Sequence, residues 1–520
     1  MDRKWWTLIA VCTGVLMLLL DITVVNVALP QIERSFRASL SDLQWVIDAY
    51  ALTLAALLLT AGSIADLAGR RRVFATGIVI FTLGSALCGV AQSATMLTLS
   101  RGFQGIGGAI MFATALALLA QAFPPKERGV AFAVFGATTG VGVAVGPVLG
   151  GALTSGLSWR WIFFVNLPVG ALALAVTLLR VQESRLPHAP RPDWPGFATF
   201  SLSLAGLVYG LIRSQPDGWG SVNVVASLAA SAALMAMFVA IERRRAEPML
   251  DLRLLRVPTF NGGLVAAWAV SASVFSLLTY LALFIQNILG YSAVQAGIRF
   301  LPFTGVIFFA SAAAGRLTQK VPARVLIASG FALATVGLLL MRGLTPTDGW
   351  THFLPGFLVS GLGVGLINVP LASTAVGVVS QERAGMASGI NSTFRQIGIA
   401  TGVAALGSIL ASLLRSRVTS GLAGTPLAAH SHRLAVAISS GELGSAAHHL
   451  PPRLQGLLYE AARAGYVHAL NSVLLIGAIV AGLATIVTFA TIRQRDFHHM
   501  QAQSGEPAGA QGAAAEMLTA

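Results

Sequence analysis

Charged side chains are scarce in this sequence of 520 residues. Asp, Glu, Lys and Arg together make up 10% of the chain, whereas the hydrophobic residues make up 55%. A water-soluble globular domain needs about 25% charged residues, most of them on its surface. The composition therefore excludes a soluble multidomain protein, a disordered chain and a coiled coil. It predicts a protein that is solvated mainly by lipid.

Cysteine and lysine are also rare, and each scarcity removes a class of chemistry. The two cysteines, Cys12 and Cys88, lie in apolar runs, where they are expected to be small core residues and not a redox or zinc pair. Only three lysines occur, and none follows the glycine pattern of a P-loop. A membrane enzyme would need a cluster of catalytic His, Asp or Cys near one interface, and the sequence shows none. We therefore expect no ATP-driven engine, no cofactor, no metal and no catalytic residues.

Long hydrophobic runs, by contrast, fill most of the chain. A bilayer core about 30 Å thick is crossed by about 20 apolar residues of a helix. Runs of this length predict fourteen transmembrane helices, at 5–29, 43–65, 73–92, 96–118, 129–153, 160–180, 196–213, 221–241, 259–289, 293–314, 325–342, 353–379, 389–413 and 467–491.

The order of these runs predicts an all-α integral membrane protein made of two six-helix bundles. Two similar halves separated by a helix pair are typical of secondary transporters. The predicted parts are an N-terminal bundle (1–180), a linker with two extra helices (181–258), a C-terminal bundle (259–491) with an outer loop (414–466), and a disordered cytoplasmic tail (492–520).

The basic residues predict the orientation of these helices. If the N-terminus is inside, most of the 34 Lys and Arg fall in cytoplasmic segments, as the positive-inside rule requires. We therefore expect a multi-pass protein of the inner (cytoplasmic) membrane with both termini in the cytoplasm. The net charge of +14 is then expected to face anionic lipid and not nucleic acid.

Three ionisable residues lie well inside predicted spans and are candidates for proton coupling. They are Asp21, Asp48 and Arg101, each about 8–12 Å below the outer end of its helix. A carboxylate inside the membrane is costly, so its default interpretation is functional. Burial raises a carboxyl pKa and a nearby arginine lowers it, so such a group can exchange a proton near neutral pH. The alternatives are a static ion pair or a carboxyl that reaches the outer interface.

Other polar residues in or near the spans are weaker candidates. Four could line a substrate pathway or serve as interhelical hydrogen-bond partners: Asn26, Gln104, Gln286 and Asn287. Four histidines of the outer segment fit no tight metal-ligand motif and are expected to be solvated: His430, His432, His448 and His449.

One sequence segment resembles a known signature. LDITVVNVALP, at 20–30, is similar to the first-helix motif of the fourteen-helix drug:proton antiporters, a branch of the major facilitator superfamily. RGFQG, at 101–105, resembles the fourth-helix motif, whose arginine is linked in that family to proton transfer. Further matches lie at 159–168, 296–302, 315–324 and 395–398, so the resemblance spans about 5–491. Some relatives carry an acid in the segment corresponding to 293–314, which here holds none.

The segment GSIADLAGRRR, at 62–72, resembles the loop between the second and third helices of the superfamily. The resemblance implies a latch on the cytoplasmic face, in which an aspartate and arginines make charge-assisted contacts and glycines permit a tight turn. The residues assigned to it are Gly62, Asp66, Gly69, Arg70 and Arg71. Alternatively, the arginines serve only to anchor the topology.

The segment GVAVGPVLGG, at 142–151, resembles the antiporter motif of helix 5, which the family links to export and not to import. Glycines every four residues make a bare helix face for close packing, and a proline bends the span. The motif residues are Gly142, Gly146, Pro147, Gly150 and Gly151. The alternative is ordinary packing of small residues.

Together, the motifs imply the major facilitator fold and a proton-coupled exporter of lipophilic, cationic or neutral small molecules. Its partners would be the substrate, protons and the lipid bilayer. The alternative is a proton symporter or a uniporter that imports a small metabolite on the same fold. An importer has no evident need for the helix 5 motif, so that motif favours export.

Overall fold

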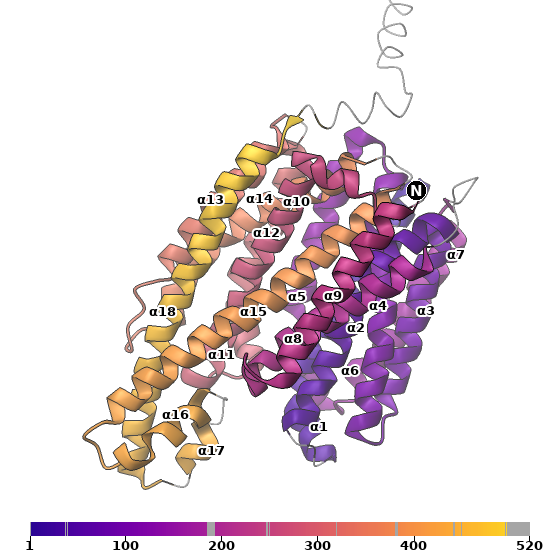
Figure 1. Ribbon diagram of the computed structural model, residues 1–520. Coiled ribbons are helices and arrows are strands. Elements are labelled where there is room, and N and C mark those ends of the chain that lie inside the picture. Colours follow the sequence, from indigo (N-terminus) through magenta and orange to yellow (C-terminus); the bar gives the residue numbers. More distant parts are fainter. Residues whose placement is uncertain are drawn as a thin grey trace, which may run out of the picture.

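The computed structural model describes residues 2–496 except 37, 39, 185–192, 246–247, 249, 319, 380–382, 440–442, 449 and 495. Every regular element in this part of the chain is a helix (Figure 1). The predicted all-α membrane fold is therefore confirmed. The predicted tail, 492–520, lies almost entirely outside the described residues.

The first seven helices correspond to the first six predicted spans, because the sixth is broken near its start. They are α1 (Arg3–Phe36), α2 (Leu40–Ala68), α3 (Arg70–Gly89), α4 (Ala94–Ala122), α5 (Pro125–Gly156), α6 (Trp161–Phe164) and α7 (Asn166–Arg180). Local sequence explains the starts of two of them. The Ser93 side chain caps α4 by accepting from Met96 N, and Pro125 occupies the first turn of α5, where no amide donor is needed.

The following elements correspond to the eight remaining spans and the segments around them. They are α8 (Trp194–Asp217), α9 (Val222–Arg244), η1 (Leu252–Arg256), α10 (Pro258–Val270), η2 (Ser271–Phe275), α11 (Ser276–Leu283), η3 (Phe284–Ile288), α12 (Ala293–Leu317), α13 (Ala323–Leu340), η4 (Trp350–Phe353), α14 (Leu354–Gly377), α15 (Ala384–Leu422), η6 (Ala428–His430), α16 (Ser431–Ser439), α17 (Leu443–His448) and α18 (Pro452–Thr491).

Thirteen stretches in the described part of the chain are long and apolar enough to cross a membrane. The 32-residue helix α5, which coincides with the predicted span 129–153, lies outside those thirteen. The ninth predicted span, 259–289, is one continuous stretch from α10 to η3, with two π-helical turns. In the first π-helical turn the Ser276 hydroxyl donates to the Ser271 carbonyl at 2.9 Å.

The last two spans are much longer than their apolar runs. The predicted outer loop, 414–466, is largely helical, because α15 continues to Leu422, α18 begins at Pro452, and α16 and α17 lie between them (Figure 1). Leu414, Val418 and Leu422 recur every four residues on α15 and belong to a buried cluster that includes Leu458 and Ala462 of α18. Hydropathy marks where lipid ends, but packing between the two helices extends them beyond it.

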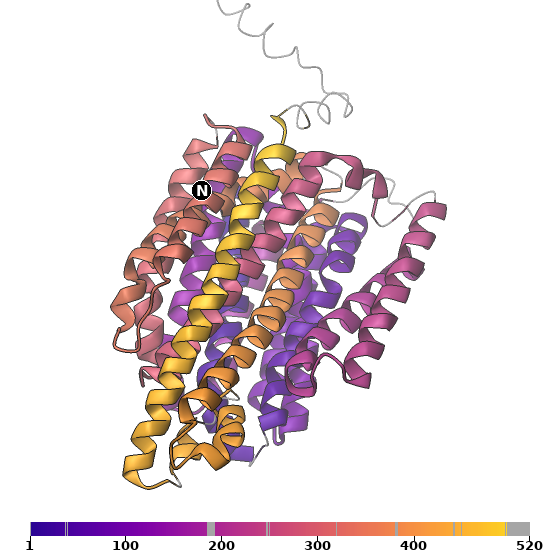
Figure 2. The ribbon, with the colours of Figure 1, turned by 60° about the vertical axis from the view of Figure 1, so that its left-hand side comes forward.

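The long helices pack side by side, and contacts between distant parts of the sequence position the site. α5 packs against both α1 and α12, α2 packs against both α4 and α15, and α8 packs against α9, α2 and α15. Figure 2 shows the α8–α9 pair at the edge of the molecule. The start of α1 and the end of α18 lie at the same end of the molecule (Figure 1), and α16 and α17 lie at the opposite end.

Candidate functional site

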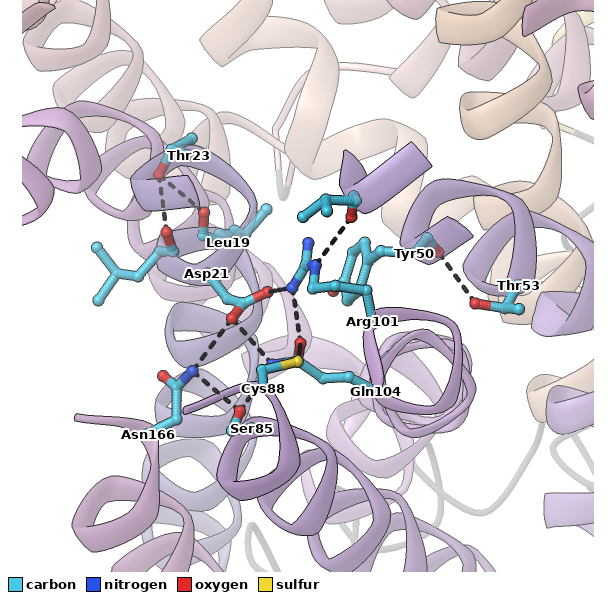
Figure 3. Close-up of polar contacts among 12 residues, drawn as sticks. Leu19, Asp21, Thr23, Tyr50, Thr53, Ser85, Cys88, Arg101, Gln104 and Asn166 are labelled. Atoms are coloured by element: carbon cyan, nitrogen blue, oxygen red, sulfur yellow. Dashed lines mark hydrogen bonds and ion pairs between the residues drawn. The ribbon is translucent and has the colours of Figure 1, made fainter. Parts of the chain in front are cut away.

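A buried carboxylate joins three helices in the first part of the chain (Figure 3). Asp21 of α1 is 2% exposed, and its Oδ2 accepts from Arg101 Nη1 of α4. Its Oδ1 accepts from Gln104 Nε2 at 2.9 Å and from Asn166 Nδ2 of α7 at 3.2 Å. The structure therefore places Asp21 and Arg101, two of the three ionisable residues selected together from the sequence, in direct contact. We call this group, with Ser85 of α3, the Asp21 cluster.

Arg101 is 1% exposed, and polar or aromatic groups surround its guanidinium. Nη1 also donates to Gln104 Oε1 at 2.6 Å, and Nε donates to the Val46 carbonyl at 3.3 Å. The guanidinium carbon lies 4.2 Å from the centre of the Tyr50 ring, a cation–π distance. Two opposite charges with this many partners can be tolerated inside a membrane protein.

A second layer of hydrogen bonds holds the side chains that contact Asp21. The Ser85 hydroxyl accepts from Gln104 Nε2 at 2.7 Å and from Asn166 Nδ2 at 3.1 Å. Gln104, predicted as a pathway or packing residue, is fully buried here and donates between helices. The apolar residue Cys88 lies at the edge of this layer, with its sulfur 3.7 Å from Gln104 Oε1.

Sequence reasoning missed three members of this environment. Asn166 lies in a motif that resembles the family, but nothing in one sequence shows which helix it faces. Ser85 is a small polar residue in an apolar run, and Tyr50 lies two residues after Asp48. The one signal in the sequence is the polar side chain of Asn166 near the start of an apolar span, where the helix is interrupted between α6 and α7.

Asp48 lies apart from the Asp21 cluster. Its position along α2 nevertheless predicts a depth in the membrane similar to the depths of Asp21 and Arg101. Residues two apart on a helix point to nearly opposite sides, so Asp48 faces away when Tyr50 faces Arg101. Asp48 is half-buried, and the charged residue that acts on it electrostatically is Arg213 of α8. Arg213 itself pairs with Asp217, at 2.8 Å. The expected trio is therefore one pair and one separate carboxyl.

A second buried aspartate connects helices from the two ends of the sequence. Asp66, near the end of α2, accepts from Arg70 Nε at 3.0 Å and Nη2 at 2.9 Å. Its two oxygens also accept from the backbone amides of Gly385 and Met386, at 3.0 and 2.8 Å, in the first turn of α15. A carboxylate at a helix N-terminus is favoured by the unpaired amides and by the helix dipole.

Glycines allow the close approach at this contact, which we call the latch. A Cβ on Gly62 would collide with the Gly385 carbonyl, so α2 and α15 approach this closely only without side chains there. Gly69 has a φ of 106° and immediately precedes α3. Glu183, after α7, accepts from the amides of Arg71 and Arg72 at 3.2 and 3.3 Å, and so completes the same turn.

The glycine face of α5 faces α1 in the described structure. Cβ atoms on Gly142 and Gly150 would lie 2.9 and 3.0 Å from Leu19 and Val24, and one on Gly146 would collide with Thr23. A Cβ on Gly151 would instead collide with Val294 of α12. The helix that carries the motif is thus held between α1 and α12. The side chain of Pro147 lies outside the described residues.

Two of the remaining pathway candidates, Gln286 and Asn287, lie in the second half of the chain and make no contact given for the Asp21 cluster. Gln286 is half-buried and Asn287 is exposed, both in the π-helical turn η3. The side chain of Asn26 lies outside the described residues. Among the described residues, no group of three or more His, Cys, Asp or Glu is gathered for a metal.

A cavity lies between α4 and α5 on one side and α14 and α15 on the other. Its lining residues are Phe112, Leu116, Phe132, Phe135, Gly136, Thr139, Asn368, Ala372, Asn391, Ser392 and Arg395. The wall is apolar and aromatic on the α4–α5 side and polar on the α15 side. Small-molecule sites in membrane transporters lie at such meeting points of helices.

Comparison with known proteins agrees with this architecture. Residues 11–403 match the family model of the Major Facilitator Superfamily. The chain belongs to this superfamily, and the resemblance indicated by the motifs is confirmed.

Three relatives cover most of the chain. The multidrug resistance protein Stp of Mycobacterium tuberculosis is 41% identical over 409 residues, which cover 78% of this chain and 76% of that protein. The puromycin resistance protein pur8 of Streptomyces alboniger is 37% identical, covering 85% and 89%. The tetracenomycin C resistance and export protein of Streptomyces glaucescens is 32% identical, covering 94% and 92%.

A solved structure shares the fold. The human organic anion transporter MFSD10 (TETRAN) superposes with a TM-score of 0.61 at 14% identity, covering 92% of this chain and all of that one. The superfamily and these relatives indicate a multi-pass membrane transporter and not an enzyme.

Proposed function

We propose that the protein is a proton-coupled antiporter that exports lipophilic small molecules or drugs across the cytoplasmic membrane. The observation that carries this proposal is the buried Asp21–Arg101 pair, an anion and a cation held by hydrogen bonds inside a spanning bundle. Ionisable residues inside a membrane cost free energy, so such a pair is by default expected to have a function. The names of the relatives, which are resistance and export proteins, support the direction of transport.

The mechanism that we propose is alternating access by two bundles, 1–180 and 259–491, with 181–258 between them. Access to the cavity would alternate as the bundles rock. The contact of Asp66 with the first turn of α15 supports this division, because it connects the two bundles at one end of the cavity. We place that end, with its cluster of arginines at 70–72, and both termini in the cytoplasm.

Protonation of Asp21 is the proposed coupling step. A proton that reaches Asp21 from the outer side removes its charge and leaves Arg101 without a counter-charge in a low-dielectric site. The helices that meet at the Asp21 cluster must then rearrange. α1 can transmit this to the cavity, because it packs on the glycine face of α5, and α5 carries Phe132 and Phe135 of the cavity wall.

Everted membrane vesicles test the proposal directly. An inward-acid pH gradient should drive uptake of a lipophilic dye by wild-type vesicles, and a protonophore should abolish it. Asp21→Asn should remove the proton-driven component while the protein remains in the membrane. Glu33→Gln is the matched control, because it makes the same change at an exposed position of the same helix. Proton-driven uptake that survives in Asp21→Asn would remove Asp21 from the mechanism, and dye loss driven by the same gradient would indicate import.

A further inference from the structure

Arg395 of α15 lines the cavity, and its positive charge is not balanced there. Its Nη2 donates to Asn368 Oδ1 at 3.0 Å. No described carboxylate lies within ion-pair distance of it, and the lining residues include no Asp or Glu. Arg70 and Arg101, which are both buried, each have an aspartate partner, whereas the half-buried Arg395 has none among the described residues. A guanidinium has further N–H groups to offer, and one neutral acceptor cannot satisfy them.

A second observation at the same place points to a ligand. Asn391 is 2% exposed and lines the cavity, and its amide nitrogen has no hydrogen-bond partner among the described residues. Buried N–H groups without a partner are rare in native proteins, and each one requires an explanation. Asn391 and Arg395 are four residues apart, so they lie one turn apart on the same face of α15. Both therefore present unused donors to the same space.

The opposite wall of the cavity complements these donors. Phe112 of α4 and Phe132 and Phe135 of α5 give it aromatic surface. A planar aromatic molecule that carries an acidic oxygen satisfies both sides. A permanent cation would meet an arginine without any carboxylate to hold it.

We infer that Arg395 and Asn391 form a subsite for the acidic oxygen of a lipophilic aromatic anion, a carboxylate or a phenolate, whose ring lies against the phenylalanines of α4 and α5. The inference rests on the proposed transport function and narrows its substrates from lipophilic small molecules to aromatic anions. It differs from the expectation from the sequence, which favoured cationic or neutral compounds. The guanidinium fork suits a carboxylate in two-point contact, and the Asn391 amide adds a third donor.

Two dyes on one ring system test the subsite. Fluorescein is an anion and rhodamine 123 is a cation, and both can be titrated into the purified full-length protein by fluorescence anisotropy at pH 7.5. We expect wild type to bind fluorescein more tightly than rhodamine 123. Arg395→Gln should weaken fluorescein binding by about tenfold or more and leave rhodamine binding within about threefold. Arg395→Lys should keep part of the affinity, and Arg299→Gln, outside the cavity, should change nothing.

Asn391→Ala keeps the test decisive if Arg395→Gln unfolds, because it removes a donor without touching the charge. It should weaken fluorescein by about threefold to tenfold at an unchanged melting temperature. A wild-type preference for rhodamine 123 overturns the inference. So does an equal loss of both dyes in a folded Arg395 variant, or no loss in a folded Asn391→Ala.

Vesicle transport separates this inference from the proposed function. Arg395-dependent fluorescein binding without proton-driven export of either dye supports the subsite and overturns the exporter. Proton-driven export of rhodamine 123 by a protein that does not bind fluorescein supports the exporter and overturns the subsite.

Discussion

Two buried aspartate–arginine pairs occur in this chain, and they are attached differently. Asp21 pairs with Arg101 and receives its other hydrogen bonds from Gln104 and Asn166, all within the first seven helices. Asp66 pairs with Arg70 on its own side and receives its other hydrogen bonds from the first turn of α15. The first pair therefore binds helices that stay together, and the second binds helices that the proposed transport cycle must separate.

The role of a charge pair is therefore indicated by the groups that surround it, and not by the pair itself. A pair that is closed on all sides is suited to respond to one proton, because there is no solvent to absorb the change. A pair whose carboxylate accepts from the backbone amides of another helix is suited to hold that helix and release it. Those amides can form hydrogen bonds to water once the contact opens. Arg395 is the third case, a cation whose partner must come from outside.

The largest effect is expected from removing one member of the closed pair. Arg101→Gln leaves the Asp21 carboxylate buried without a cation and should cost about 3–5 kcal/mol of stability. The double variant Asp21→Asn with Arg101→Gln should recover at least half of that loss but not proton-driven transport. Thermal unfolding of the purified variants measures the stability changes, and the vesicle assay measures transport. A double variant no more stable than Arg101→Gln would contradict the account of the pair.

The next effect tests how the Asp21 cluster is connected to the cavity. Gly146→Val places a side chain where the Thr23 side chain lies and should destabilise the protein by about 1–3 kcal/mol. Gly140→Ala on the same helix is the control, because its Cβ would have 3.6 Å to the nearest atom. Equal melting temperatures for the two variants would show that α1 and α5 are not tightly packed at this point.

Opening of the latch should be measurable at one position. In a background without native cysteines, Asp66→Asn should speed the labelling of Ser63→Cys by an impermeant maleimide about tenfold in everted vesicles, because the charge that holds α15 is lost. Asp251→Asn is the control, since its pair with Arg383 is half exposed and worth about 0.2–1 kcal/mol. Labelling that responds equally to both substitutions would contradict a special role for Asp66.

A smaller effect is expected at Asp48. It is half-buried beside Arg213 and does not contact Arg101, so Asp48→Asn should lower proton-driven uptake by less than about threefold, whereas Asp21→Asn should remove it. The vesicle assay compares the two at matched expression. A loss as large as that of Asp21→Asn would mean that proton coupling uses both carboxyls.

The smallest effect belongs to a carboxylate outside the membrane, which serves as a reference for both pairs. The Asp348 carboxylate accepts from the Thr345 amide at 2.7 Å, and this hydrogen bond lowers the Asp348 pKa below 3.8. Its contribution to stability is therefore present above about pH 4 and is lost as the pH falls through the lowered pKa. Asp348→Asn should melt slightly below wild type at pH 7, and the gap should close near pH 3. A gap independent of pH would contradict this assignment.

Much of the fold could be predicted, because lipid imposes a simple rule on sequence. A helix in the bilayer must be apolar over about 20 residues, so each span leaves a visible run. The rule applies only inside the bilayer, so the sequence predicts a loop at 414–466, where the structure continues α15 to Leu422 and begins α18 at Pro452.

The order and helical type of the spanning segments could be read from the sequence alone, and so could Asp21 and Arg101, because a charge among apolar residues is conspicuous in one dimension. Asp66 was indicated by the resemblance of 62–72 to the loop motif of the superfamily. The packing of the helices was needed to show that Asn166 and Ser85 complete the Asp21 cluster, that Asp48 lies apart from it, and that Arg395 faces a cavity lined by no carboxylate. The reason is physical. The energy of a buried charge depends on neighbours from other helices, and their rotation and depth are set by packing, which no single run of residues records.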